Sequence, residues 1–377
     1  MGAFDELLAR LTADHFSGSD PYDALSSPLL GRLAYTAVLR RTVIQMLKRS
    51  PVNLRPLLLV DEQPHTKSLA LAVSACAAFA RSQFGRDEAA TALSLARSLA
   101  DRAIRVESGI GWGYDFDVQT RWGYYRRGEP NAVATAFSGH ALLDAAELAQ
   151  QQADLRESAR AAVAFSCSVL LVDREGECYF AYHPGGRVPI HNANMLVAGL
   201  VARTGDSAAL SVAQRAVDFT VARQRRDGSW PYGEGNGLAW VDGFHTAYVL
   251  DDLSRWHAAT GAQPVRKALE RGLSFYLDHL VDSDGAARAL PESRYPVDIH
   301  ACATAITVLS RLRDFDTRAL PTAGRVLTWT LEHMRRRDGR FAFQQHKWWR
   351  NNVSYVRWSD AHMLLALATF AEAVDDV

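Results

Sequence analysis

The chain repeats one structural unit roughly every 50 to 70 residues. Each unit has a helical stretch, a turn with glycine and usually an acidic residue, an aromatic loop, and a second, apolar helix. The clearest copies begin their loops at GIGWGYDFD (109–117), REGECYFAYHPGG (174–186), RRDGSWPYGEG (225–235), DSDGAARALPESRYP (282–296) and RRDGRFAFQQHKWW (336–349). A repeat of this length predicts a series of helical hairpins.

The two helices of each unit differ in their patterning. The helix after each loop, as in residues 192–202 and 361–373, is apolar or small around most of its circumference, so we expect it to be buried on nearly all sides. The helix before each loop, as in residues 213–224 and 265–280, is amphipathic and carries its charges on one face. This alternation predicts an inner ring and an outer ring of helices.

A weaker hairpin runs from Leu33 through the loop at residues 53–67 to the apolar helix at residues 68–81, and it brings the number of hairpins to six. Alternating strand patterns are nearly absent. The sequence therefore predicts an all-α chain, an (α/α)6 toroid of six helical hairpins with short aromatic loops. We favour closure over an open solenoid, which would leave an apolar face in water. Residues 1–30 are expected to form an N-terminal helical extension, and residues 31–377 the single toroid domain.

Composition excludes several functional classes. The 42 basic and 42 acidic residues cancel, so no overall field attracts nucleic acid, and polyanion binding would have to be local. The longest strongly apolar stretch, residues 69–80, is about half the roughly 20 residues of a membrane span, and the amino terminus lacks a secretory pattern. We expect a cytoplasmic protein with no transmembrane segment. The sequence does not determine its oligomeric state. Compact metal-binding spacings and nucleotide-binding motifs are missing, so we predict neither a metal site nor a cofactor.

Polar side chains recur where the inner helices begin. Asp242 precedes His245, Asp298 precedes His300, and Asp360 precedes His362. Each aspartate could simply cap its helix. Capping does not explain the histidine two or three residues later in three separate repeats. Because the loops of a toroid gather at one end, these pairs predict a shared site.

The aromatic residues of the loops suggest the ligand. Trp112, Trp230 and Phe343 are typical of wedges between neighbouring repeats. Trp348 and Trp349 beside Arg350, and Trp240 beside Asp242, instead combine flat aromatic faces with charged groups. A sugar ring stacks its C–H face on such a wall, and its hydroxyl groups need polar partners. We therefore expect a carbohydrate or a glycan precursor as substrate.

Two kinds of chemistry remain open. Glycosidic hydrolysis needs two carboxylates, for which Asp117 and Glu234 are the best pair. Epimerisation or elimination at C5 of a uronate would use histidine or tyrosine as base, with an arginine neutralising the carboxylate. The catalytic candidates are Asp117, Glu234, Asp242, His245, Asp298 and His300. The substrate-binding candidates are Asp115, Arg121, Tyr124, His191, Asn194, Tyr232, Trp240, Trp348, Trp349, Arg350, Asp360 and His362.

Four stretches resemble the bacterial polysaccharide-biosynthesis proteins of the VpsJ type. They are SPVNLRPLLLVDEQPHTKSLAL (50–71), GWGYDFDVQTRWGYYRRGEPNAVATAF (111–137), VPIHNANMLVAGLVAR (188–203) and QRRDGSWPYGEGNGLAWVDGFHTAYVLDDL (224–253). The resemblance covers most of the chain from about residue 25 onward. It implies an α/α toroid, in the group of the terpenoid cyclases and six-hairpin glycosidases, and a setting in exopolysaccharide, capsule or O-antigen assembly.

A more distant resemblance is to the terpene cyclase and prenyltransferase toroid, whose QW-type repeats are similar to RRDGSWPYGE and RRDGRFAF. The acidic DxDD and DDxxD sequences of those enzymes are missing. We therefore expect a carbohydrate-active hydrolase, lyase or epimerase that uses carboxylate and histidine acid–base catalysis. The alternatives are a terpenoid cyclase-like enzyme and a non-catalytic glycan-binding assembly protein.

Overall fold

The computed structural model describes residues 2–149, 152–174 and 176–375, and most of its helices pack as an inner set and an outer set. The inner helices are α4 (Thr66–Arg81), α6 (Ala132–Ala146), α8 (His191–Thr204), α10 (Gly243–Thr260), α12 (Ile299–Arg311) and α14 (Ala361–Asp375). The outer helices are α1 (Gly2–Ala13), α5 (Glu88–Asp101), α7 (Ala153–Phe165), α9 (Ser207–Ala222), α11 (Gln263–His279) and α13 (Ala319–His333).

The inner helices close into a ring. Each packs against the next along the chain, and α14, the last, packs against α4, the first. Each inner helix also packs against the outer helix that follows it, while α14 packs against α1. The predicted all-α toroid of six hairpins is confirmed.

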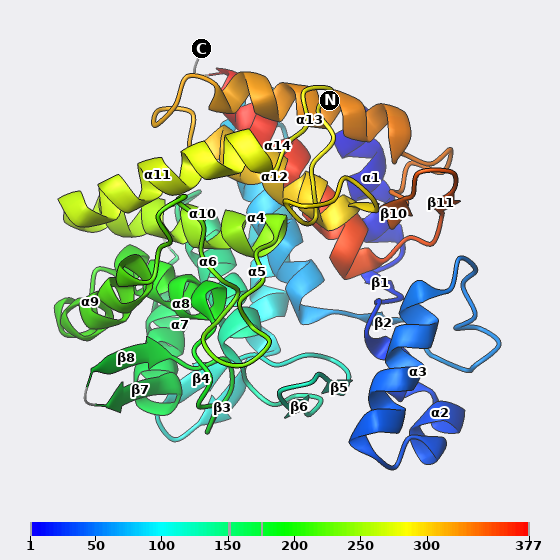
Figure 1. Cartoon of the computed structure of the whole chain (residues 1–377), viewed down its shortest axis with the longest axis horizontal. Coiled ribbons are helices and arrows are strands. Elements are labelled where there is room, and N and C mark those ends of the chain that lie inside the picture. Colours follow the sequence, from blue (N-terminus) through cyan, green and yellow to red (C-terminus); the bar gives the residue numbers. More distant parts are fainter. Residues whose placement is uncertain (1, 150–151, 175, 376–377) are drawn as a thin grey trace.

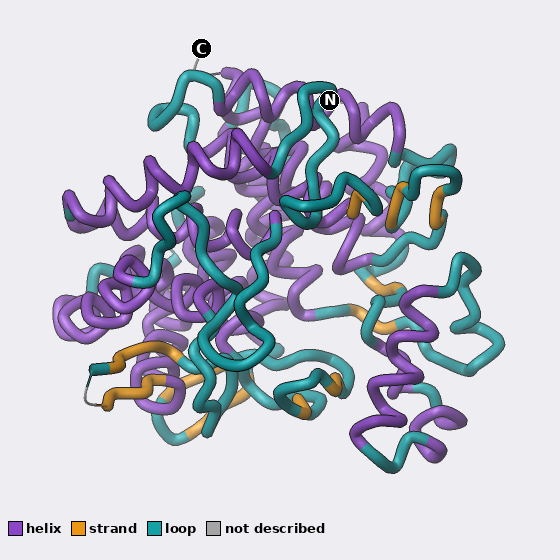
Figure 2. The backbone as a smooth tube through the Cα atoms, in the orientation of Figure 1, coloured by secondary structure: helices purple, strands orange, loops and turns teal. Residues whose placement is uncertain are grey.

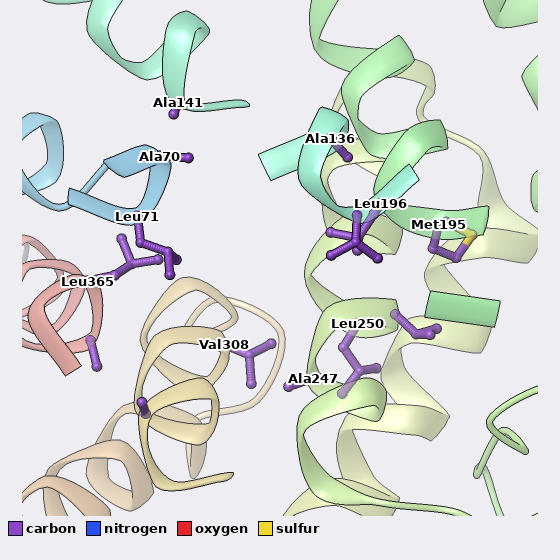
Figure 3. Packing of buried hydrophobic residues seen from close by; sticks show 14 of the residues in the cluster. Ala70, Leu71, Ala136, Ala141, Met195, Leu196, Ala247, Leu250, Val308 and Leu365 are labelled. Atoms are coloured by element: carbon purple, nitrogen blue, oxygen red, sulfur yellow. The ribbon is translucent and has the colours of Figure 1, made fainter. Parts of the chain in front are cut away.

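The core lies between the inner helices, which contact one another through small and aliphatic side chains such as Ala70, Ala136 and Leu250 (Figure 3). Between the hairpins lie the expected aromatic wedges. The buried indoles of Trp112 and Trp230 donate hydrogen bonds to the ends of the neighbouring outer helices, at the carbonyl oxygens of Leu99 and Thr220.

The sixth outer helix is not the predicted one. The expected first hairpin, beginning at Leu33, was wrong, because helix α1 occupies that place and buries Phe4, Leu7 and Leu11. Helices α2 (Pro28–Leu33) and α3 (Ala37–Arg49) lie beside the ring instead (Figure 1). Within α3 only Ile44 and Leu47 are buried, a stripe too narrow for a place in the ring. The domain division at residue 30 stays a prediction.

We call residues 23–60 the α2–α3 lobe. It begins with the 3-10 turn η1 (Asp23–Ser26) and has its own small core of Ala24, Ile44, Leu47 and Val60. The buried guanidinium of Arg55 binds Asp23 within the lobe, and it joins the lobe to the rest of the protein by donating to the carbonyl oxygen of Asp20 and to the Tyr355 hydroxyl at 3.3 Å.

Short antiparallel strands brace the loops at the ends of the helices (Figure 2). The pairs are β1 (Ser17–Gly18) with β2 (Gln63–Pro64), β3 (Ile104–Val106) with β4 (Gly109–Gly111), β5 (Val118–Gln119) with β6 (Tyr124–Tyr125), and β7 (Leu171–Arg174) with β8 (Glu177–Phe180). A three-stranded sheet has the order β11 (Arg350–Asn351), β10 (Gln344–Gln345), β9 (Val297–Asp298). There are also two π-helical turns: η2 (Ser166–Leu170) follows α7, and η3 (Val356–Asp360) leads into α14. Across the described ranges, no helix is both long and apolar enough for a membrane span.

Candidate active site

A cavity of about 260 Å³ lies where the inner helices begin. The first turn of every inner helix, or the turn leading into that helix, contributes to the cavity wall, as expected for a toroid. These residues are Lys67, Val133, Asn192, Phe244, His245, His300, Arg357 and Trp358. The loops and the lobe boundary add Tyr22, Tyr114, Phe116, Val118, Thr120, Trp122, Tyr125, Tyr182, Tyr232 and Trp240, and Tyr248 reaches in from the second turn of α10.

One side of the cavity is an aromatic platform. The rings of Tyr232 and Trp240 stack with centroids 4.3 Å apart and planes inclined by 10°. Trp122, more than a third exposed, lies across from them with its ring centroid 6.2 Å from that of Tyr232. A flat apolar face bordered by polar groups suits the C–H face of a sugar ring.

Helix α10 presents an aspartate–histidine pair to the cavity. Asp242 caps the helix by accepting the His245 amide at 2.8 Å, and its second oxygen lies 2.6 Å from Nδ1 of the same histidine. Because Nδ1 donates to the carboxylate, the imidazole lone pair is on Nε2. The His245 side chain is 20% exposed, so a substrate in the cavity can reach this basic nitrogen.

Tyr248, one turn further along α10, shares its hydroxyl group with two imidazoles from other helices. The hydroxyl lies 2.7 Å from Nε2 of His300 and 3.4 Å from Nε2 of His362. Nδ1 of His300 lies 3.2 Å from the Trp358 carbonyl and donates to it, so Nε2 accepts the tyrosine proton. Burial lowers the pKa of His300 well below its usual value and raises the pKa of Tyr248 well above its own. The pair is therefore a neutral phenol and a neutral imidazole.

Lys67 is buried in the same wall. Its Nζ lies 3.9 Å from the ring centroid of Phe137 and 3.5 Å from the Tyr248 hydroxyl. Within the described chain, no carboxylate pairs with this amine. Burial, assisted by the charge of Arg357, lowers the pKa of Lys67 well below its usual value.

The π-helical turn η3 places Arg357 and Trp358 in the cavity wall. Asp20 holds the Arg357 guanidinium through Nε at 2.6 Å and Nη2 at 2.9 Å, and the bonds between these two groups leave Nη1 free. Burial acts to raise the pKa of Asp20, but the charge and hydrogen bonds of Arg357 outweigh it and the pKa is lowered. The ion pair therefore stays charged. Asp298 fixes the neighbouring indole by accepting Trp358 Nε1 at 2.9 Å.

Several predicted residues lie in this cavity and others support it. His245, His300, Tyr232 and Trp240 line the wall. Asp242 and Asp298 are N-caps whose carboxylates orient His245 and Trp358. His362 lies behind Tyr248.

The other aspartate candidates bind protein groups outside the cavity wall. Asp115 accepts the Thr66 amide where α4 begins, Asp117 accepts from the Tyr124 hydroxyl at 2.5 Å, and Asp360 accepts the Phe341 amide. None of the three aspartates, nor Tyr124, is among the lining residues.

Glu234 and His191 form a separate pair, with Nε2 of the imidazole 2.9 Å from the carboxylate oxygen. The hydrogen bond from His191 lowers the pKa of Glu234, opposed by burial. Asn194 braces the same region through Phe180 and Thr220. These residues do not line the cavity.

The remaining candidates are on the surface. Arg121 is exposed, and Trp348, Trp349 and Arg350 belong to the hairpin of β10 and β11, outside the cavity wall. Their roles in substrate binding stay predictions.

The candidate lists missed Lys67, Tyr248 and Trp358. Lys67 had a signal, because it is a cation at the start of an otherwise apolar inner helix. The signal for Tyr248 was weaker: it follows His245 by three residues and so lies on the same helix face. The part of the chain that the structure describes has no group of three or more His, Cys, Asp or Glu residues suited to a metal ion.

In sequence, no family model and no curated protein matches the chain. Solved structures match it in fold. A cellobiose 2-epimerase from Bacillus thermoamylovorans aligns with a TM-score of 0.60 at 12% identity, over 81% of this chain and 87% of the epimerase. The GH76 α-mannanase of Bacteroides thetaiotaomicron gives 0.61 at 14%, over 82% and 86%.

An unsaturated glucuronyl hydrolase specific for heparin gives 0.60 at 14%, over 84% of this chain and 89% of the hydrolase. The identities are low, so these likenesses concern the fold. The chain has the same α/α-toroid fold as these three enzymes.

Proposed function

We propose that the chain is a carbohydrate-active enzyme that moves a proton on an acidic sugar, as an epimerase or a lyase acting on a uronate. One observation carries the proposal. The ionisable groups in the cavity wall are imidazoles, phenols, the Lys67 amine and the Arg357 guanidinium, and no described lining residue is Asp or Glu. Such a wall offers hydrogen-bond donors and has no carboxylate that would repel an anionic substrate.

The two acid–base groups have distinct roles. Nε2 of His245 removes the proton from the carbon next to the substrate carboxylate, and the electron pair of that bond moves into the carboxylate. The Tyr248 hydroxyl, backed by His300, supplies a proton. If the proton reaches the opposite face of the same carbon, the product is the epimer. If it reaches the glycosidic oxygen on the neighbouring carbon, that C–O bond breaks and an unsaturated uronate forms.

Arg357 and Lys67 would bind the carboxylate and stabilise its charge as the proton leaves. Burial, assisted by the charge of Arg357, lowers the pKa of Lys67 and so disfavours the protonated amine. An incoming carboxylate favours the protonated amine, so binding should take up a proton. The platform of Tyr232 and Trp240 supports the choice of a sugar, which stacks on aromatic rings.

Hydrolysis by two carboxylates is less well supported. It needs one acid on each side of the scissile bond, and Asp117 and Glu234 bind other protein groups away from the cavity. The aromatic wall would also suit a terpenoid cyclase. Protonating an alkene needs a strong acid, however, and the described lining has no carboxylic acid.

We further propose a role in polysaccharide biosynthesis in the cytoplasm, and the VpsJ-type resemblance supports the biosynthetic role. His245 and Tyr248 both line the cavity, where they can reach a substrate, and this favours catalysis over a scaffold role.

The test is a matched panel of oligosaccharides, half with a uronate and half with the corresponding neutral sugar. We expect the enzyme to convert a uronate substrate and leave its neutral counterpart unchanged. Tyr248→Phe should lower kcat by about 10² to 10⁴, whereas Tyr276→Phe, which alters a buried tyrosine of outer helix α11, should not. Conversion of only the neutral sugars, or full activity in Tyr248→Phe, would overturn the proposal.

A further inference from the structure

The α2–α3 lobe exposes an unusual amount of apolar surface. Ten large apolar side chains within it are at least a third exposed, more than in the rest of the described chain together. They are Leu29, Leu33, Tyr35, Val38, Leu39, Met46, Val52, Leu54, Leu57 and Leu59. A concentration of this kind marks a surface that docks on something apolar.

The same lobe is strongly basic. Residues 23–60 contain six arginine and lysine residues and a single acidic residue, Asp23, although the whole chain is neutral. Arg55 is buried and paired with Asp23. Arg40 binds Gln119 and lies over the Tyr124 ring, and Lys48 binds the Tyr22 hydroxyl and lies over the Trp358 ring. Arg32, Arg41 and Arg49 form no ion pair within the described chain, so these three charges are available to a partner.

A second exposed element lies next to the lobe. The hairpin of β10 and β11 touches it, because the Asn351 side chain donates to the Ser50 carbonyl oxygen at 3.2 Å. The tip of this hairpin carries Trp348, 84% exposed, and Trp349, between the cations Lys347 and Arg350. Exposed tryptophan beside basic side chains is typical of protein segments at the boundary between water and lipid.

We propose that the α2–α3 lobe and the tip of the β10–β11 hairpin together form a membrane-binding surface that takes anionic lipids. The apolar side chains enter the boundary between headgroups and acyl chains, and Arg32, Arg41 and Arg49 bind the lipid headgroups. The protein attaches to the bilayer surface and does not cross it.

Charge argues against a second copy of the chain as the occupant. A twofold interface would place the same patch against itself, and the cations of the two lobes would repel one another. An anionic bilayer complements both the charge and the apolar character of the surface. The inference is independent of the reaction proposed above.

The experiment is flotation of the full chain with vesicles of phosphatidylcholine alone or with phosphatidylglycerol. We expect about tenfold more protein to float with the anionic vesicles, and high salt to abolish the difference. The triple variant Leu33→Ser, Val38→Ser, Leu57→Ser and the variant Arg32→Glu, Arg49→Glu should both lose this binding. All five side chains are exposed, so the fold should be unaffected.

A matched control changes exposed apolar residues elsewhere, Leu290→Ser with Val374→Ser, and should float as the parent protein does. Trp348→Ser should reduce flotation by itself. The proposal is overturned if the two kinds of vesicle bind equally, or if the triple variant still floats. It is also overturned if light scattering shows a dimer that the triple variant converts to monomers while neither binds vesicles.

Discussion

At the scale of single residues, Asp242 has two functions that one substitution can separate. One oxygen caps helix α10 and the other orients the His245 imidazole. Asparagine is an equally good cap, so Asp242→Asn should change the free energy of unfolding by less than about 0.5 kcal/mol. The amide would donate to Nδ1 and move the proton to Nε2, so kcat/KM should fall by about 10² or more.

Thermal unfolding and the pH profile of kcat/KM on a uronate substrate measure both effects. Full activity in Asp242→Asn would show that His245 is not the base.

Asp360 gives a prediction about pH. Burial raises the pKa of this fully buried carboxyl to about 6, opposed by hydrogen bonds from Phe341 and Ser354. In the unfolded chain it has a pKa near the ordinary 3.8. Between these values the folded state holds a proton that the unfolded state has released, so this group destabilises the fold as pH rises.

Asp360→Asn removes that titration. We expect the stability of the variant relative to the parent to improve by up to about 3 kcal/mol between pH 4 and pH 7, as urea unfolding would measure. A difference in stability that does not change with pH would contradict the raised pKa.

At the scale of elements, the inner helices approach one another through small residues. A methyl group added at Gly199 in α8 would lie 2.1 Å from a carboxylate oxygen of Asp252 in α10. That carboxylate is fully buried and bound to Arg255 at 2.6 Å, so it has no room to move. Gly199→Ala should therefore destabilise the protein by about 1 to 3 kcal/mol or more.

Gly324 in outer helix α13 is the matched control. The nearest atom to an added methyl group there lies at 3.6 Å, an ordinary contact. Gly324→Ala should be neutral or stabilising by up to about 1 kcal/mol, because alanine favours the helix. Equal effects of the two substitutions in chemical denaturation would refute close packing of the inner ring.

The sequence predicted the inner helices but not the outer partner of α14, and the reason is physical. The inner helices were clear because burial on all sides makes them apolar around the whole circumference, as in residues 192–202. The outer partner of α14 was not clear, because α1 and α3 are both short amphipathic segments and only tertiary packing decides between them. The wide stripe of Phe4, Leu7 and Leu11 on α1 was the available signal.

At the scale of the whole molecule, ring closure explains which part of the site could be predicted. Histidines at the starts of separate helices come together because every inner helix begins at the same end, and so His245 and His300 were found. Loop residues were harder to place. Trp348 and Asp117 belong to hairpins whose direction depends on strand pairing, which repeat spacing does not specify.

Exchange of the C5 hydrogen of the uronate tests the proposed proton transfer most directly. The enzyme is incubated in D2O with an oligosaccharide that contains a uronate, and deuterium at C5 is followed by NMR and mass spectrometry. We predict that the parent protein introduces deuterium at C5 of the epimer, or forms the unsaturated uronate, and that Tyr248→Phe and Asp242→Asn are strongly impaired. Cleavage that retains the C5 hydrogen and adds oxygen from water would contradict the account.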